Sequence, residues 1–408
     1  MKFRLRVETW MPVGRTLCYD RRMHKLRWRI LTAVGLILLV GCALGQGAEP
    51  APVADLDLIQ VSPVQTRVLT TTPTPTETRE PTPTETAVPS ATPTATATPS
   101  PTATPTPTHP LMIELMRQEE YPGSEITFER TLEPGVNYDR YVISYDSEGH
   151  KIYALFTVPW GTPPESGWPV ILFNHGWIDP EIYRTTERYL DYVDAIARSG
   201  YIVLRSDYRG HGDSEGEARN AYVSPGYTAD VLNALASVKR YEKADPERIG
   251  MWGHSMGGFI TLRSMVISDE IKAGVIWGGV VVSYADLFTR WRSDDDNPQT
   301  PTPNPTWVAE RRRSRFGVHG SPQENPGFWD AMSSNSYLAD VSGPIQLHHG
   351  TADDSVPHLF SEILYAEMQE AGKLGELYLY EGDNHNLAIS FWTAMNRSLE
   401  FFDEHVKK

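Results

Sequence analysis

The sequence predicts an α/β fold in which helices cover both faces of a mostly parallel β-sheet. From residue 111 onward, short apolar runs typical of buried strands alternate with segments of helical periodicity. The run PVILF at 169–173 lacks the polar alternation of a half-exposed strand, as expected where both faces of a sheet are covered. Because strands separated by helices are usually joined by crossovers, neighbouring strands should be parallel. We therefore expect one domain over residues 111–408.

The first predicted element of this domain is a β-hairpin over 141–159, which turns at Ser147-Glu148-Gly149 and forms an antiparallel edge. Alternating strands and helices follow. The expected strands are 169–176, 201–207, 248–254, 272–278, 344–349 and 376–381. The expected helices are 187–199, 227–241, 257–267, 358–371 and 387–406.

Residues 283–337 interrupt this alternation with a polar, irregular stretch that is too long for an ordinary loop. We interpret it as an inserted cap over a site. Its aromatic residues Phe288, Trp291 and Trp307 either bind substrate or only pack the cap against the domain. The basic run at 310–315 is expected to be solvated.

The N-terminal segment 1–41 is predicted to be a lipoprotein-type signal peptide. Residues 1–30 contain nine Lys or Arg and two acidic residues, and an apolar run too short to span a bilayer follows. Leu39-Val40-Gly41-Cys42 resembles the bacterial lipobox, in which the cysteine is lipidated. This resemblance implies an exported protein anchored to the membrane at Cys42. An uncleaved anchor helix, or cleavage at 43–48, is the alternative.

Translation starts either at Met1 or at Met23, since a start at Met23 leaves a compact basic segment before the apolar run. Residues 42–110 form a Thr/Pro-rich segment that cannot bury apolar surface, so we expect a disordered linker. The only cysteines are Cys18 and Cys42, and the domain beyond them has no disulfide. With residues 1–30 at +7 and the whole chain at −15, the remainder carries about −22, which argues against a nucleic-acid partner.

The pattern Gly-x-Ser-x-Gly, typical of a serine nucleophile on a sharp turn, occurs twice. Ser255 follows the apolar strand 248–252 and precedes a helix, the strand-turn-helix setting of a nucleophile elbow. Gly253 and Gly257 are expected to be required because a Cβ would collide across this turn. Ser214 follows a loop without a helix behind it, so its role is in turn structure.

A serine nucleophile needs a histidine base and a carboxylate, and in an α/β-hydrolase these follow in the order Ser, acid, His after later strands. The predicted strand 344–349 is followed by Asp353, with Asp354 as the rival acid. The next strand is followed by His385, the expected base. Asp383 is expected only to shape its turn.

The segments GHSMGG, HGTADDSVP and GDNHN, together with FNHGW and DYRGHGDS, resemble the catalytic domain of the prolyl oligopeptidase family of serine hydrolases. The similarity extends from about residue 140 to the end. It implies an α/β-hydrolase fold, with Ser255 as nucleophile, Asp353 as acid and His385 as base. It also implies an oxyanion hole formed by the amides of Met256 and Trp177.

The peptidases of that family usually carry a β-propeller, and no repeat of blade length precedes this domain. We therefore expect hydrolysis of carboxylic esters, with a prolyl oligopeptidase-like peptidase acting on short peptides or aminoacyl amides as the alternative. A non-catalytic surface module is a second alternative. No cofactor or metal is expected, because His348 and His349 lack zinc-ligand spacing. The acyl group, the leaving group and the oligomeric state stay open.

Overall fold

The computed structural model describes residues 108–291 and 317–408. The predicted signal segment, Cys42, nearly all of the linker and Trp307 lie outside these residues. Within the described ranges, no helix is both long and apolar enough to cross a membrane. The fold below is that of the predicted α/β domain.

The domain is built on one nine-stranded sheet with the order β1-β2-β3-β5-β4-β6-β7-β8-β9. The first three strands and β5 pair antiparallel, whereas all other neighbours pair parallel. The strands are β1 (Thr127–Leu132), β2 (Tyr138–Ser147), β3 (His150–Pro159), β4 (Trp168–Asn174), β5 (Ile202–Ser206), β6 (Ala244–His254), β7 (Ala273–Trp277), β8 (Ile345–Gly350) and β9 (Gly375–Tyr380). This mostly parallel sheet confirms the predicted fold class.

The predicted hairpin is present, but it does not form the edge of the sheet. Its turn passes through Glu148 and Gly149 with φ of 50° and 78°, the positive values that a tight hairpin turn requires. Strand β1 pairs outside β2 and is the true edge. Its side chains are almost all exposed, so it lacks the apolar alternation by which a strand is recognised.

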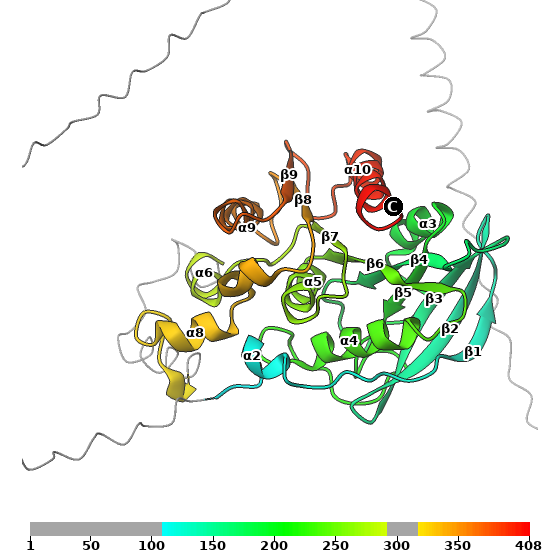
Figure 1. The fold of residues 1–408 in the computed structure, drawn as a ribbon. Coiled ribbons are helices and arrows are strands. Elements are labelled where there is room, and N and C mark those ends of the chain that lie inside the picture. Colours follow the sequence, from blue (N-terminus) through cyan, green and yellow to red (C-terminus); the bar gives the residue numbers. More distant parts are fainter. Residues whose placement is uncertain (1–107, 292–316) are drawn as a thin grey trace, which may run out of the picture. The chain divides into compact units, whose positions relative to one another are not determined.

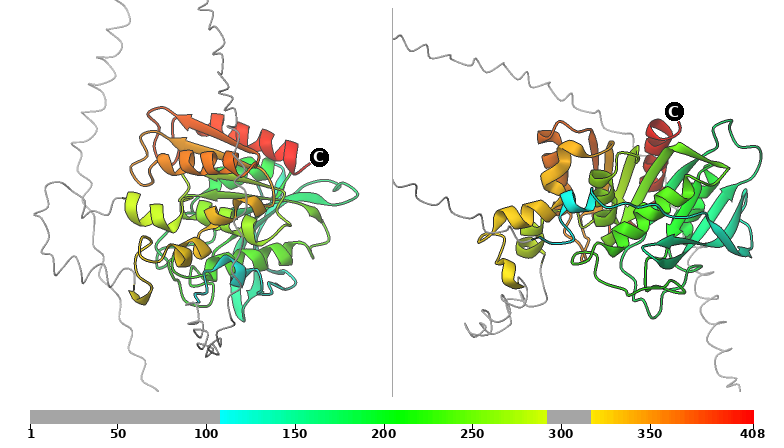
Figure 2. Two further views of the ribbon diagram at one scale, coloured as in Figure 1. Left: turned by 60° about the vertical axis from the view of Figure 1, so that its left-hand side comes forward. Right: turned by 60° about the horizontal axis from the view of Figure 1, so that its bottom comes forward.

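Helices cover both faces of the sheet (Figure 1). Helices α3 (Leu190–Arg198) and α10 (Phe391–His405) pack on one face, and α4 (Gly226–Val238), α5 (Met256–Ile267) and α9 (Leu359–Glu370) on the other. A short helix, α2 (Ile113–Met116), precedes the sheet. In both views of Figure 2, the teal hairpin lies at the opposite end of the sheet from the orange C-terminal strands.

The described part of the predicted cap contains short helices, so the expectation of an irregular segment is wrong there. These are α6 (Tyr284–Arg290), η2 (Gly317–His319), α8 (Pro326–Met332) and η3 (Ser334–Asp340). Phe288 packs against Tyr284 and Trp329 of the same region. The indole N–H of Trp291 donates to the Ser355 carbonyl over 3.1 Å, so this residue connects the segment to the loop after β8.

Strand order reverses at β4, and this reversal determines where side chains can converge. The chain passes from β4 to β5 on one side, and β6 then pairs with β4 on the other side. In open α/β sheets, ligands bind outside the carboxyl ends of the strands at such a reversal. Gly176-Trp177 follow β4 and Ser255 follows β6, so these residues lie at that position.

Candidate active site

Ser255 occupies a strained turn between β6 and α5. Its φ of 56° lies in a region that residues with a side chain rarely adopt, at a cost of about 1–3 kcal/mol. A Cβ at Gly253 would lie 2.4 Å from the Gly257 carbonyl oxygen, and a Cβ at Gly257 would lie 1.9 Å from the Asn174 carbonyl oxygen. Both glycines are therefore required by close backbone approach, as predicted for this turn.

The backbone of Ser255 is held on two sides while its side chain stays partly exposed. Its amide donates to the Trp277 carbonyl over 3.0 Å, and its carbonyl accepts from the amides of Gly258 and Val280. Ser214 is different, because its side chain is buried and its hydroxyl accepts a hydrogen bond from the Tyr153 amide over 2.9 Å. Ser214 therefore stabilises a loop, as the sequence suggested.

Asp353 and His385 meet at the carboxyl ends of β8 and β9. The distance between His385 Nδ1 and Asp353 Oδ2 is 2.6 Å. The Asp353 side chain is fully buried, whereas that of His385 keeps 16% of its exposure. The rival Asp354 is exposed, and its carboxylate accepts only from the neighbouring Ser355 hydroxyl over 3.2 Å.

The His385 imidazole lies beside the end of β7, the same strand end that binds the Ser255 amide. A Cβ at Gly278 would approach His385 Nδ1 to 3.0 Å, so this glycine leaves room for the ring. With Nδ1 bonded to Asp353, the ring nitrogen left for proton transfer is Nε2, which has no hydrogen bond within 108–291 and 317–408. The arrangement provides the parts of a Ser-His-Asp site.

The carboxylate of Asp353 is ionised because four donors surround it. The amides of Ser355 and Val356 each donate to Oδ1 over 2.9 Å. His349 and His385 contact Oδ2 at 3.0 and 2.6 Å. Burial alone would raise the pKa of Asp353, but these hydrogen bonds outweigh burial and hold the pKa well below its ordinary value.

His349, which the sequence analysis considered only as a metal ligand, contacts the acid of the site, and this role was not predicted. Its Nε2 contacts both Asp353 Oδ2 and the Val356 carbonyl oxygen at 3.0 Å, and its Nδ1 contacts the Ser361 hydroxyl at 2.7 Å. A carbonyl only accepts, so Nε2 carries the proton and donates it toward the carboxylate. Its place immediately before the acid loop was the available signal. In the described part of the chain, no cluster of His, Cys, Asp or Glu could hold a metal ion.

The loops that carry Asp353 and His385 are bonded directly to each other. The Ala352 amide donates to the Asp383 carbonyl over 2.9 Å, and the Gly382 amide donates to the Thr351 hydroxyl over 2.8 Å. The Asp383 carboxylate accepts from three amides of its own turn, those of Asn384, Ile389 and Ser390. Asp383 therefore shapes the turn, as predicted.

Two backbone segments beside Ser255 could hold an oxyanion. Met256 is the first residue of α5, where amide N–H groups have no intrahelical partner. Gly176 passes so close that a Cβ there would lie 3.1 Å from the Ser255 Cβ, and Trp177 follows it. The predicted Met256 and Trp177 amides thus come from segments on either side of the serine.

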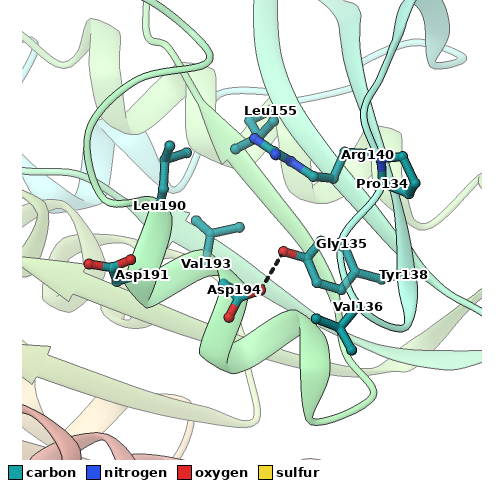
Figure 3. Close-up of a pocket in the computed structure, with 10 residues that line it drawn as sticks. All are labelled: Pro134, Gly135, Val136, Tyr138, Arg140, Leu155, Leu190, Asp191, Val193 and Asp194. Carbon is teal, nitrogen blue, oxygen red and sulfur yellow. Dashed lines mark hydrogen bonds between the residues drawn. The ribbon is translucent and has the colours of Figure 1, made fainter.

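None of these side chains lines the hollow shown in Figure 3. It has a volume of about 400 Å³ and is lined by residues of β2, β3 and α3 and the segment before β2, none of which is a predicted site residue. The Tyr138 hydroxyl donates to Asp194 of α3 across 2.8 Å at this hollow. No serine or histidine, the groups that carry the chemistry at the predicted site, lines this hollow.

A comparison with known protein families shows to which family the domain belongs. The family model described as peptidase S9, the prolyl oligopeptidase family, matches residues 189–408, more than half of the 408-residue chain. The chain belongs to the prolyl oligopeptidase family. The matched range includes Ser255, Asp353 and His385, and the domain is accordingly a serine hydrolase with the α/β-hydrolase fold.

Similar proteins include peptidases that are longer than this chain. The chain is 27% identical over 261 residues to the uncharacterized peptidase YuxL of Bacillus subtilis. This alignment covers 59% of this chain and 35% of that protein. It is 24% identical over 261 residues to human dipeptidyl peptidase 8. This alignment covers 61% of this chain and 26% of that protein. The chain thus spans about a third or less of the length of these relatives.

Solved structures of both peptidases and esterases share the fold. The acylaminoacyl peptidase of Pyrococcus horikoshii aligns with a TM-score of 0.53 and 21% identity, over 67% of this chain and 42% of that one. Acetyl xylan esterase 1 from Thermoanaerobacterium sp. aligns with a TM-score of 0.51 and 16% identity, over 72% of this chain and 90% of that one. At these identities, the likeness establishes the fold alone.

Proposed function

We propose that this serine hydrolase cleaves carboxylic esters through an acyl-enzyme on Ser255. The observation that carries the proposal is the 2.6 Å contact of His385 with Asp353, beside the strained turn that presents Ser255. The Ser255 oxygen attacks the acyl carbon while His385 Nε2 takes the hydroxyl proton. The amides of Met256 and Trp177 bind the developing oxyanion. The ester C–O bond then breaks, and His385 gives the proton to the leaving alcohol.

In the second half of the proposed cycle, water attacks the acyl-enzyme and Ser255 is the leaving group. His385 takes a proton from water as the oxygen attacks the acyl carbon, and returns it to the Ser255 oxygen as the acid leaves. The Asp353 carboxylate holds His385 with its proton on Nδ1 and stabilises the imidazolium formed in each half. Esters are proposed as substrates because acetyl xylan esterase 1 matches this domain over 90% of its own length.

Peptide hydrolysis is the second candidate, and the relatives favour it. YuxL is named a peptidase and the human relative is named a dipeptidyl peptidase, and both match this chain at higher identity than the esterase does. The same acyl-enzyme chemistry would then release an amine from an aminoacyl or prolyl amide. The two candidates differ in the leaving group rather than in the catalytic residues.

A substrate panel distinguishes these candidates. Short-chain nitrophenyl esters are compared with aminoacyl and prolyl nitroanilides by kcat/KM, with Ser255→Ala as the inactive reference. An ester preference beyond the intrinsic reactivity difference supports esterase function, whereas faster turnover of one amide class selects the peptidase. A folded wild type that no fluorophosphonate probe labels would instead indicate the non-catalytic binding module.

Export and lipid anchoring at Cys42 are part of the proposal. Their support is the basic segment, the apolar run and Leu39-Val40-Gly41-Cys42. Metabolic labelling with palmitate, followed by detergent-phase partitioning, tests the anchor in wild type and Cys42→Ser. Equal labelling of both proteins contradicts it.

A further inference from the structure

A chain of hydrogen bonds joins the segment after β4 to the loop that carries His385. The Gly176 amide donates to the Tyr189 hydroxyl over 3.0 Å. The Tyr189 hydroxyl lies 2.7 Å from His254 Nδ1, and His254 Nε2 lies 2.9 Å from the His385 carbonyl oxygen. No motif singles out Tyr189, and His254 occupies the unspecified position x of the pattern Gly-x-Ser-x-Gly, directly before Ser255. The family resemblance assigns neither residue a role.

The chemistry of the two ends determines where each proton lies. The His385 carbonyl can only accept, so His254 Nε2 carries a proton and donates it. Burial lowers the pKa of His254 to about 3, and the ring is therefore neutral with a bare Nδ1. Nδ1 accepts the Tyr189 hydroxyl proton, and the Tyr189 oxygen accepts from the Gly176 amide. Every donor in this series of hydrogen bonds has one acceptor.

The donor-to-acceptor direction of these hydrogen bonds decides which amide after β4 is free to bind an oxyanion. The Gly176 N–H is consumed by Tyr189, whereas the Trp177 N–H has no hydrogen-bond partner in the described ranges. At its other end, the chain fixes the backbone of His385, whose ring also lies against His254 with 4.5 Å between centroids. One tyrosine hydroxyl thus couples the orientation of the oxyanion segment to that of the base.

The backbone at Tyr189 is strained, and a buried arginine holds it. Arg188 and Tyr189 have φ of 56° and 51°, two consecutive left-handed residues at the start of α3. Such conformations persist only where the surroundings enforce them. The buried Arg205 guanidinium donates to the carbonyls of Arg188 and Thr185, and Arg205 lies on β5, between β3 and β4 in the sheet. The Tyr189 hydroxyl is therefore placed by the sheet itself.

We propose that Tyr189 and His254 are positioning residues that align the Trp177 amide and the His385 imidazole for the same reaction. The inference rests on the proposed function of Ser255. Loss of the Tyr189 hydroxyl leaves the Gly176 amide and His254 Nδ1 without partners, and both loops can then rotate. A displacement of about 1 Å in a reacting group can lower turnover about 100-fold.

The test uses four variants of the full chain: Tyr189→Phe, His254→Phe, the double variant, and Tyr138→Phe as the control. Tyr138 also donates its hydroxyl to a residue of α3, Asp194, and this hydrogen bond involves no predicted site residue (Figure 3). The measurements are kcat and KM on a nitrophenyl ester, the rate of fluorophosphonate labelling, and thermal unfolding. Tyr189→Phe removes one oxygen atom and keeps the ring contacts with Phe173 and His254.

We expect each single variant to lower kcat and the labelling rate about 10- to 100-fold with little change in KM. The double variant should be no slower than the slower single variant, because both substitutions break one chain. Wild-type kcat in Tyr189→Phe overturns the inference, as do additive losses or an equal loss in Tyr138→Phe. If His254→Phe does not fold, Tyr189→Phe alone decides. Turnover that survives Ser255→Ala would instead overturn the proposed function.

Discussion

The replacement Asp353→Asn tests the site most directly, because the structure shows what an amide would meet. The carboxylate accepts four hydrogen bonds, two at Oδ1 from backbone amides and two at Oδ2 from histidines. An asparagine has one oxygen and one NH₂ group. In either orientation, the NH₂ group faces two N–H donors, either the two backbone amides or the two histidines. A hydrogen bond to the NH₂ group forms only if one of these donors becomes an acceptor.

The contact with His385 is the one that can change, because an imidazole can move its proton, whereas His349 keeps its Nε2 proton on the Val356 carbonyl. With the asparagine oxygen kept toward Ser355 and Val356, the NH₂ group faces His385 Nδ1, which becomes an acceptor. The proton of His385 then lies on Nε2, and this nitrogen no longer accepts the Ser255 proton. We expect kcat to fall about 10⁴-fold, or about 5.5 kcal/mol in the activation free energy, with KM nearly unchanged.

The assay is steady-state turnover of a nitrophenyl ester, with fluorophosphonate labelling as a second readout and thermal unfolding to confirm folding. Asp354→Asn is the matched control, since its side chain is exposed and bonds only to Ser355 among the described residues. The control should retain wild-type kcat. Turnover of Asp353→Asn within tenfold of the wild type, or an equal loss in both variants, refutes the reasoning.

Three further predictions follow from the geometry. Ser255→Ala should abolish turnover while Ser214→Ala retains most of it, because the Ser214 hydroxyl bonds to a strand amide; equal kcat losses would contradict this. Gly257→Ala should prevent formation of the turn, since its Cβ would lie 1.9 Å from the Asn174 carbonyl oxygen, whereas Gly327→Ala, with nothing within 4 Å, should unfold in urea like the wild type. Burial lowers the pKa of His175, His254 and His348 from 6.5 to about 3, so below pH 6.5 only the unfolded chain takes up these protons. The free energy of unfolding should therefore fall as the pH drops from 6.5 toward 3, and His254→Phe should reduce that slope by about 1.4 kcal/mol per pH unit; an unchanged slope would show that His254 is protonated in the fold.

The elements that sequence patterns predicted well are those with a buried face. Strands β4 to β9 and helices α3, α4, α5, α9 and α10 were all expected close to their observed bounds, because burial imposes a period on the sequence. The edge strand β1 was missed because it buries almost nothing. The short helices of the predicted cap were missed because segments of seven residues or fewer show less than two helical periods.

Site residues divide in the same way between local patterns and long-range contacts. Ser255, Gly253 and Gly257 could be found in the sequence because a tight turn makes its demands on neighbouring residues. His349 and Tyr189 could not, since their partners Asp353, Gly176 and His254 belong to other loops. A hydrogen bond between two loops leaves no regular spacing in either segment.

The sequence alone determined the class of fold, the turn that carries Ser255 and the order of the polar clusters after later strands. These features follow from local stereochemistry and from periodic burial, which act within a few residues. Only the tertiary structure decided that Asp353 and not Asp354 contacts His385, and that the Gly176 amide is already bound. Adjacent residues on a loop differ in direction rather than in chemistry, and packing against the rest of the chain sets that direction.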